Sequence, residues 1–244
     1  MFNDHFEIFL ADTAESKAIH YNLRYQIYCE EMEFEDKNNF PAEQEYDKWD
    51  ENAVPFLLRH KNTDQWVGAV RLIFRNGQLL PIEELCSVDE LKNSRDSYSK
   101  QLVEVSRLCL VKEIRRKTES LHRPYENIDK EDEIHERTNV ITLNNHRKFR
   151  QSILFGLLHA AAKYSIENDI NDWFWLGTDA LARILRRSGL NILKVGTACQ
   201  HRGKRFPFKM DPVQTFLTLS SDYAKSYFLY SELKTAEPVL QATG

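Results

Sequence analysis

The feature that most constrains the fold is the order in which helical and alternating hydrophobic patterns follow one another. Residues 5–10 are apolar and extended in character, which predicts a short strand. Asp12 offers an N-cap and Glu15 a capping-box partner for a helix that runs to about Glu30. The acidic, polar residues 31–52, broken by a proline, predict a long loop after that helix.

The next part of the chain predicts antiparallel strands. Residues 54–60 and 66–74 flank a polar turn, as the two arms of a β-hairpin do. Residues 102–111 alternate and are rich in β-branched side chains, which favours a further strand. The strongly charged residues of about 112–145 have weak periodicity, and we expect them to form a surface insertion.

The last part returns to helices alternating with strands. An apolar stripe predicts a helix over 149–168, and residues 172–177 predict a strand. Thr178 can cap a second helix that ends before Gly189, a residue suited to the C′ position. Further strands are expected at 192–198 and at 215–220. This order predicts an α/β sandwich around one mixed sheet, with residues 1–244 as a single domain.

Composition narrows the class of protein. With 42% apolar and 29% charged residues the chain is globular, and its net charge of −4 gives no global attraction to nucleic acid. No apolar stretch is long enough to span a bilayer, and the acidic N-terminus does not resemble a signal peptide, so we expect a cytoplasmic protein. The four cysteines form no CxxC pair, which argues against a zinc site or a disulfide framework and favours four reduced thiols.

Charged residues at unusual places mark the candidate site. Arg71 lies in an otherwise apolar strand, where a guanidinium needs a carboxylate partner. Taken alone, it indicates a structural salt bridge. Further charges occur on elements that can share one face of the sheet, and together they favour a charged site: Arg24, Asp47, Asp50, Glu104 and Arg107.

The spacing of Glu104 and Arg107 makes a structural prediction. Residues three apart in a regular strand point to opposite faces of the sheet. Both side chains can therefore reach one cleft only if this strand is bulged or splayed.

The order of these residues resembles the acyl-homoserine-lactone synthases and their relatives, the N-acyl amino acid synthases, including a subgroup associated with bacterial exosortase/PEP-CTERM systems. Residues 178–189 resemble the family helix that ends in Arg-x-Gly. The resemblance runs over most of the chain, and it is carried by Arg24, Tyr28, Phe34, Asp47, Asp50, Gly68, Arg71, Glu104, Ser106 and Arg107.

The resemblance implies a fold like that of the GCN5-related N-acetyltransferases (GNAT), a three-layer α-β-α sandwich with a splayed central sheet. It implies an acyl donor on the phosphopantetheine of acyl carrier protein, an amine acceptor, and no permanently bound cofactor or metal. Tyr28 and Phe34 differ from the residues usual in lactone synthases, and the insertion is long. These departures favour an amino acid over S-adenosylmethionine as acceptor.

The chemistry assigns roles to the candidate residues. Glu104 can take a proton from the attacking amine, and Arg24 or Arg107 can bind a carboxylate of the acceptor. Asp47 and Asp50 are suited to hold these arginines in place. Arg71 completes the candidate catalytic set. The candidate substrate-binding residues also include Tyr28, Phe34, Ser106 and Thr178.

Basic residues indicate the donor side. No Gly-rich turn precedes the helix at 149–168, so a single phosphate is a better match than the pyrophosphate of coenzyme A. Residues 180–210 contain no acid, which indicates either a solvated face or a surface for an acidic partner such as acyl carrier protein, and no nucleic-acid motif is present. The candidate residues for carrier protein or phosphopantetheine are Arg147, Lys148, Arg150, Arg183, Arg187, Lys204 and Arg205.

The sequence therefore predicts an N-acyltransferase that moves a long-chain fatty acyl group from acyl carrier protein to an amino acid. Two alternatives stay open. One is an acyl-homoserine-lactone synthase that uses S-adenosylmethionine, and the other is a non-catalytic module that binds acyl carrier or lipid. Trp173 and Trp175 are typical of a core, although one face of their strand could line an acyl tunnel.

Overall fold

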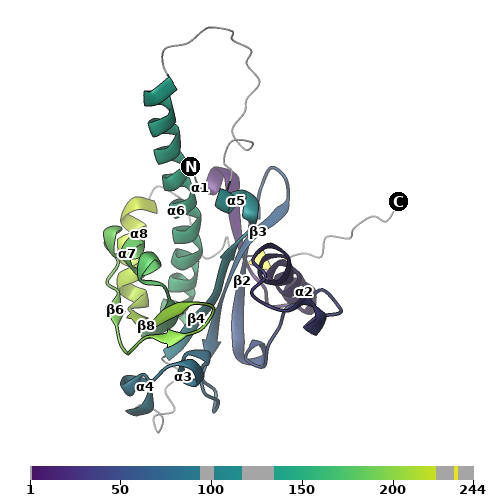
Figure 1. The fold of residues 1–244 in the computed structure, drawn as a ribbon, viewed down its shortest axis with the longest axis vertical. Coiled ribbons are helices and arrows are strands. Elements are labelled where there is room, and N and C mark those ends of the chain that lie inside the picture. The colour runs from purple at the N-terminus through teal and green to yellow at the C-terminus, as the bar shows by residue number, and fades with distance from the viewer. Residues whose placement is uncertain (1, 94–101, 117–134, 224–233, 236–244) are drawn as a thin grey trace.

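The computed structural model describes residues 2–93, 102–116, 135–223 and 234–235, with only the helical backbone over residues 135–150 (Figure 1). One open mixed sheet runs through these residues in the order β6-β8-β5-β4-β3-β2-β1-β9, and β7 pairs with β8 at its edge. Its strands are β1 (Phe6–Leu10), β2 (Ala53–His60), β3 (Gln65–Phe74), β4 (Leu102–Leu110), β5 (Asp172–Gly177), β6 (Leu193–Lys194), β7 (Cys199–Gln200), β8 (Lys204–Met210) and β9 (Lys234–Thr235).

Helices cover both faces of this sheet. Figure 1 shows α2 (Ala14–Tyr25) on one side and α6 (His135–Glu167), α7 (Asp179–Arg187) and α8 (Pro212–Tyr223) on the other. The short helices are α1 (Phe2–His5), α3 (Pro81–Leu85), α4 (Asp89–Asn93) and α5 (Lys112–Arg116). The three-layer α-β-α sandwich predicted from the sequence is confirmed.

The sheet splays between β4 and β5. These strands run parallel and pair only from Leu102 opposite Asp172 to Glu104 opposite Phe174. Beyond that pair β4 continues to Leu110 and β5 to Gly177 without pairing to each other. The two strands therefore diverge toward their carboxyl ends and leave a cleft between them.

Helix α2 begins one residue later than predicted. Thr13, not Asp12, is the N-cap, because its Oγ1 accepts from the Ser16 backbone N–H at 3.1 Å and its own N–H donates to Ser16 Oγ at 3.0 Å. The helical path continues through a π-helical segment, Gln26–Glu31, which is close to the predicted end. The loop that follows contains the 3₁₀ turns Lys37–Asn39 and Asp50–Asn52.

The C-terminal part differs from the prediction. The strand expected at 215–220 is wrong, because these residues belong to α8, where Pro212 opens the helix and Asp211 caps it. Thr215 and Leu219 are buried one turn apart. The strands β7, β8 and β9 were not predicted, and the longest of them, β8, carries basic residues around the buried Phe208 and Met210. The strand expected at 192–198 shrinks to β6.

Residues 117–134, most of the insertion, lie outside the described residues, and its last part already belongs to α6.

The expectation of four reduced thiols is wrong. Cys86 and Cys199 form a disulfide over a sequence separation of 113, while Cys29 and Cys109 are free and buried. Only the tertiary fold brings this pair together.

Across the ranges that the structure covers, no helix is both long and apolar enough to cross a membrane.

Candidate functional site

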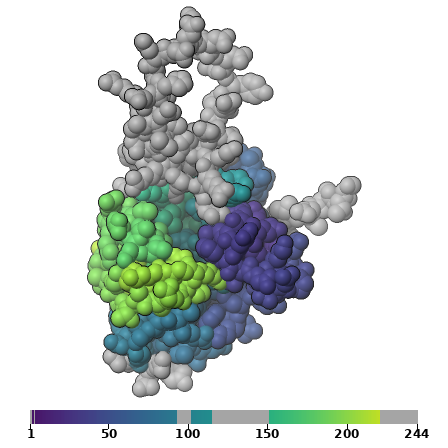
Figure 2. Space-filling view, viewed as in Figure 1, coloured from purple at the N-terminus to yellow at the C-terminus, as the bar shows by residue number. Residues whose placement is uncertain are grey.

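A cavity of about 980 Å³ opens where β4 and β5 diverge. Its walls come from the π-helical segment after α2, the 31–52 loop, β3, α3, β4, α6, β5, α7 and the hairpin formed by β7 and β8. In Figure 2 the yellow-green segment near residue 200 lies across this face and meets the purple N-terminal part of the chain. The volume is at the upper end of what small-molecule sites occupy.

One half of the cavity is apolar. It lies between the diverging strands and the helices α6 and α7. Trp175 lines it from β5, as the sequence allowed, and Trp173 also reaches it although its side chain is fully buried. The other apolar residues are Leu108, Leu110, Leu154, Leu158, Leu176, Leu181, Ile184 and Leu185. This half suits a hydrocarbon chain.

The other half is charged and is organised around Arg71. Its two terminal nitrogens donate to the Asp47 carboxylate at 2.8 and 2.7 Å, a bidentate pair, and one of them lies 2.5 Å from Asp50. Its Nε donates to Ser106 Oγ at 2.9 Å. The sequence predicted that an arginine in this apolar strand needs carboxylate partners. Arg71 finds them in the loop between α2 and β2.

Two further arginines complete the cluster. Arg24 donates from Nε to Glu45 at 2.5 Å and from its terminal nitrogen to Asp50 at 2.6 Å. Arg107 lies 2.7 Å from Glu45 and 3.2 Å from Asp47. We refer to Arg24, Arg71, Arg107, Glu45, Asp47 and Asp50 as the charged cluster, which holds three cations and three anions.

Two buried carboxylates of the cluster, Glu45 and Asp50, keep a lowered pKa. Burial alone raises the pKa of Glu45, but Arg24 and Arg107 outweigh it and hold this pKa below its ordinary value. Asp50 behaves in the same way, with Arg24 and Arg71 outweighing the effect of burial on its pKa. Asp47 and Asp50 thus hold the arginines, as the sequence predicted.

The position of Arg24 differs from what its predicted role in acceptor binding requires. Its side chain is fully buried and does not line the cavity, because Glu45 and Asp50 hold it beneath the floor. It is therefore not placed to meet an acceptor carboxylate, and its contacts in the structure are with Glu45 and Asp50. Arg107 and Arg71 do reach the cavity.

The bulge predicted in the strand of Glu104 and Arg107 is confirmed. Ala69 of β3 faces Cys109 and Arg71 faces Ser106, so Arg107 and Leu108 together stand opposite the single residue Val70. Arg107 takes a left-handed backbone conformation with φ of 51°. As a result Glu104 and Arg107, three apart, line the same cavity.

Glu104 occupies the point where β4 and β5 begin to part. Its side chain is buried, and its Oε2 accepts the backbone N–H of Ile82 at 2.7 Å. Burial raises its pKa to about 8, although the Ile82 N–H and Arg71 act in the opposite direction. A carboxyl group with such a pKa can exchange a proton with an amine near neutral pH.

The remaining predicted residues fall into three groups. Tyr28, Phe34, Ser106, Thr178 and Arg205 line the cavity. Thr178 also caps α7, with its Oγ1 accepting from the Leu181 N–H at 3.2 Å. The basic residues Arg183, Arg187 and Lys204 are exposed and are not part of the lining. The side chains of Arg147, Lys148 and Arg150 lie outside the described part of α6.

Sequence reasoning missed several polar residues that line the cavity, among them Glu35, Glu45, His201 and Arg202. Glu45 stands two residues before Asp47, so its acidic neighbours were the available signal. Glu35, His201 and Arg202 offered none, because the last two reach the site only through the β7–β8 hairpin. Burial lowers the pKa of His201, with Arg107 and Arg205 adding to the effect.

Within the part of the chain that the structure covers, no group of three or more His, Cys, Asp or Glu side chains could hold a metal ion.

Residues 23–123 match the family model described as the acetyltransferase (GNAT) domain. The splayed sheet and the bulged strand, together with this match over part of the chain, are features of a GNAT-like fold. No curated protein matches the chain in sequence.

Solved structures with the same fold include BjaI, a CoA-dependent acyl-homoserine lactone synthase. It is 17% identical, with 97% of this chain and 95% of that chain covered and a TM-score of 0.61. The lactone synthase LasI is 16% identical, with coverage of 89% and 95% and a TM-score of 0.54. FeeM, an N-acyl amino acid synthase from uncultured soil microbes, is 12% identical, with coverage of 86% and 92% and a TM-score of 0.53.

Proposed function

We propose that the protein is an N-acyltransferase that moves a long-chain fatty acyl group from acyl carrier protein to the amine of an amino acid. The observation that carries this proposal is the composition of the cavity. An apolar half suited to an acyl chain meets a charged half suited to an amino acid, and Glu104 lies at their junction. We also propose that the reaction takes place in the cytoplasm.

The proposed reaction begins with removal of a proton from the acceptor ammonium by Glu104, directly or through a water molecule. The neutral amine attacks the thioester carbonyl carbon, and the C–S bond breaks as the amide forms. As the amide forms, the nitrogen gives up its second proton to water, and the leaving thiolate of phosphopantetheine takes up the proton that Glu104 removed first. Because pairing of β4 to β5 ends at Glu104, backbone N–H groups further along that edge of β4 can donate to the developing oxyanion.

The choice of carrier protein as donor is supported by the exposed arginines of α7. Several basic residues between 180 and 210 already have acidic partners, since Lys194 pairs with Asp179 and Lys209 pairs with Asp172. Arg183 and Arg187 are exposed, and they have no ion pair among those that the described residues form. They are suited to the acidic surface of a carrier protein.

A second candidate acceptor is S-adenosylmethionine, since the fold is shared with BjaI, whose structure was determined with S-adenosylmethionine and isopentyl-CoA. The deciding experiment incubates the protein with acyl carrier thioester and either an amino-acid mixture or S-adenosylmethionine, followed by mass spectrometry. An N-acyl amino acid supports the proposal, and a lactone with methylthioadenosine supports the second candidate. Carrier binding without any product indicates a non-catalytic module.

Reversing the charge of α7 tests the carrier surface. In the double variant Arg183→Glu/Arg187→Glu we expect the KM for acyl carrier protein to rise about tenfold or more, because rim charges act mainly on association. The kcat and the KM for acyl-pantetheine should stay unchanged. Lys61→Glu, at an exposed turn residue outside the cavity, is the matched control. Equal losses with both donors would contradict carrier docking on α7.

Enlarging a residue of the apolar half tests the acyl site. We expect Leu154→Trp to shift the product toward shorter acyl chains and to lower kcat/KM for the longest accepted chain about tenfold. Ile166→Trp, on the same helix but outside the cavity lining, should leave the product profile unchanged. Mass spectrometry of products from a mixed pool of acyl donors gives the distribution. An unchanged profile in Leu154→Trp would mean that the acyl chain binds elsewhere.

A further inference from the structure

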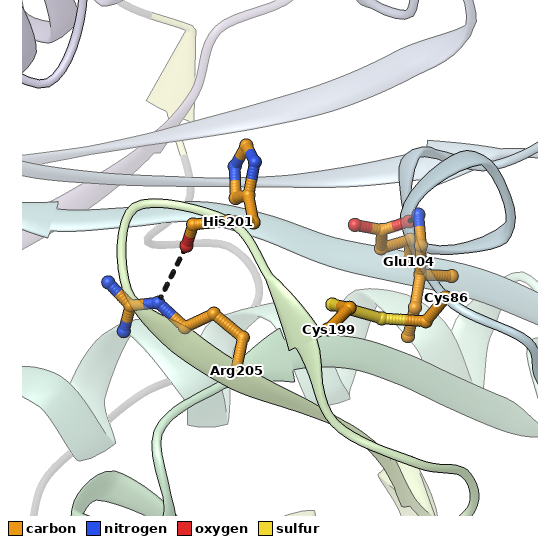
Figure 3. The surroundings of a disulfide bond; sticks show 6 residues. Cys86, Glu104, Cys199, His201 and Arg205 are labelled. Atoms are coloured by element: carbon orange, nitrogen blue, oxygen red, sulfur yellow. Dashed lines mark hydrogen bonds between the residues drawn. A yellow bond between two sulfur atoms is a disulfide. The ribbon is translucent and has the colours of Figure 1, made fainter.

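The β7–β8 hairpin reaches over the charged half of the cavity and is held at both ends. At its base the disulfide joins Cys199 to Cys86, which follows α3. At its tip Arg202 forms an ion pair with Glu35 of the 31–52 loop. Figure 3 shows the disulfide, Glu104 and the hairpin residues His201 and Arg205 in one neighbourhood. The hairpin therefore presents its tip residues to the cavity from a fixed position.

A single carboxylate occupies the space between two arginines at this tip. The Glu35 carboxylate pairs with Arg202, and it lies 3.5 Å from the terminal nitrogen of Arg107. Glu35 is not part of the charged cluster, since it comes from an exposed stretch of loop beside Phe34. The Arg202 guanidinium also lies 5.8 Å from the centre of the Phe34 ring.

The hairpin tip carries more positive than negative charge, so it can bind an additional anion. Within the charged cluster three arginines already face three carboxylates. Arg205 also lines the cavity and donates to the backbone carbonyl oxygens of His201 and Arg202, which carry no net charge. Arg202 and Arg205 thus face one carboxylate, that of Glu35, and the hairpin tip has a surplus of positive charge.

We propose that Arg202 binds the carboxylate of the acceptor amino acid, and that Glu35 occupies this position until the acceptor displaces it. This inference rests on the proposed function and names the recognition element of its acceptor site. A planar guanidinium matches a carboxylate in geometry and charge. Arg107 lies beside the position and shares the cavity with Glu104, so an amino acid held here keeps its amine on the side of the base.

Calorimetry on the full-length protein provides a test that does not depend on turnover. The twenty proteinogenic L-amino acids and S-adenosylmethionine, which also has an α-carboxylate, are the probes, and the tightest ligand is compared with its carboxamide. We expect the wild type to prefer the carboxylate. Arg202→Gln should raise the Kd of the carboxylate ligand about 10- to 100-fold and change that of the carboxamide less than threefold.

Variants of Glu35 and Arg59 provide two further measurements. Glu35→Gln removes the internal competitor, so the Kd of the carboxylate ligand should fall severalfold. Arg59→Gln, at a partly exposed arginine outside the cavity, is the matched control and should change neither Kd.

Three results would overturn the inference. They are the absence of binding by every probe, an equal loss for carboxylate and carboxamide in Arg202→Gln, and a higher KM for acyl carrier protein with an unchanged Kd for the amino acid. The last result would assign Arg202 to the phosphate of the donor. Product formation is measured separately, so amino-acid binding through Arg202 without acyl transfer would remove the proposed function and leave this inference in place.

Discussion

Glu104→Gln is expected to lower kcat about 10²- to 10⁴-fold, because the variant has no group at this position that takes a proton from the amine. The amide is nearly the same size, and its oxygen can still accept the Ile82 N–H that Glu104 accepts at 2.7 Å. We therefore expect the Kd values of donor and acceptor to change little. Single-turnover kinetics with acyl carrier thioester, together with calorimetry, separates the two effects.

The same substitution should change how stability depends on pH. Burial raises the pKa of Glu104 from its ordinary value of 4.5 to about 8, so the folded protein keeps a proton that the unfolded chain releases between these values. The wild type should therefore lose stability as pH rises through this window, by about 2–4 kcal/mol. The amide of the Glu104→Gln variant cannot ionise, so the variant should lack this loss and be more stable than wild type at pH 8. Denaturant unfolding of both proteins at pH 5 and pH 8 measures this change in the free energy of unfolding.

The pH dependence of the rate follows from the same group. Only the ionised carboxylate accepts a proton, so wild-type kcat should rise with pH and level off above about pH 8. His201 is the competing base, since its lowered pKa leaves it neutral at pH 7 and it lines the same cavity. His201→Asn serves as the comparison. Full activity in Glu104→Gln with a large loss in His201→Asn would transfer the role of base to His201.

Arg24→Met is expected to destabilise the protein by about 3–5 kcal/mol, although Arg24 does not touch the cavity. The substitution leaves the carboxylates of Glu45 and Asp50 buried without their closest cation. For a chain of this size the loss corresponds to a fall in Tm of about 6–20 °C. Thermal and denaturant unfolding at pH 7 give both quantities.

A surface arginine provides the matched control for this prediction. Arg59 pairs with Glu7 and Asp64, but its side chain is 26% exposed and Asp64 is 74% exposed. Water screens such pairs, so Arg59→Met should cost about 1 kcal/mol or less. Adding Glu45→Gln to Arg24→Met should restore part of the stability, because it removes one of the unpaired charges. Equal costs for Arg24→Met and Arg59→Met would show that the charged cluster does not hold the site together.

Much of the site could be predicted from the sequence, because single residues do not fit the local structure expected around them. Arg71 stands in an apolar strand where only a carboxylate partner makes an arginine tolerable, and the structure supplies Asp47 and Asp50. Glu104 and Arg107 are three residues apart, so a regular strand would point them to opposite faces. The bulge at Arg107 allows both to reach the same cavity. Such conflicts can be read locally, because strand geometry and the cost of a buried charge do not depend on the rest of the fold.

The helices and hairpins that were predicted correctly also depend on local signals. The β2–β3 hairpin follows from alternation and its turn, and α7 follows from Thr178 as cap and Gly189 with φ of 86°. The assignment of 215–220 as a strand was wrong because β-branched residues outweighed the helix signal of Asp211 and Pro212. Propensity is a weak guide where packing against α6 decides the outcome.

Long-range contacts were decided by the tertiary structure alone. The sequence by itself determined the order of layers, the bulged strand and the arginine and carboxylate types of the charged cluster. Which groups touch depended on the fold: Arg24 lies beneath the cavity, Cys86 meets Cys199 across 113 residues, and Arg202 meets Glu35 over the site. No local pattern encodes such pairs, because each depends on how distant elements pack around one splayed sheet.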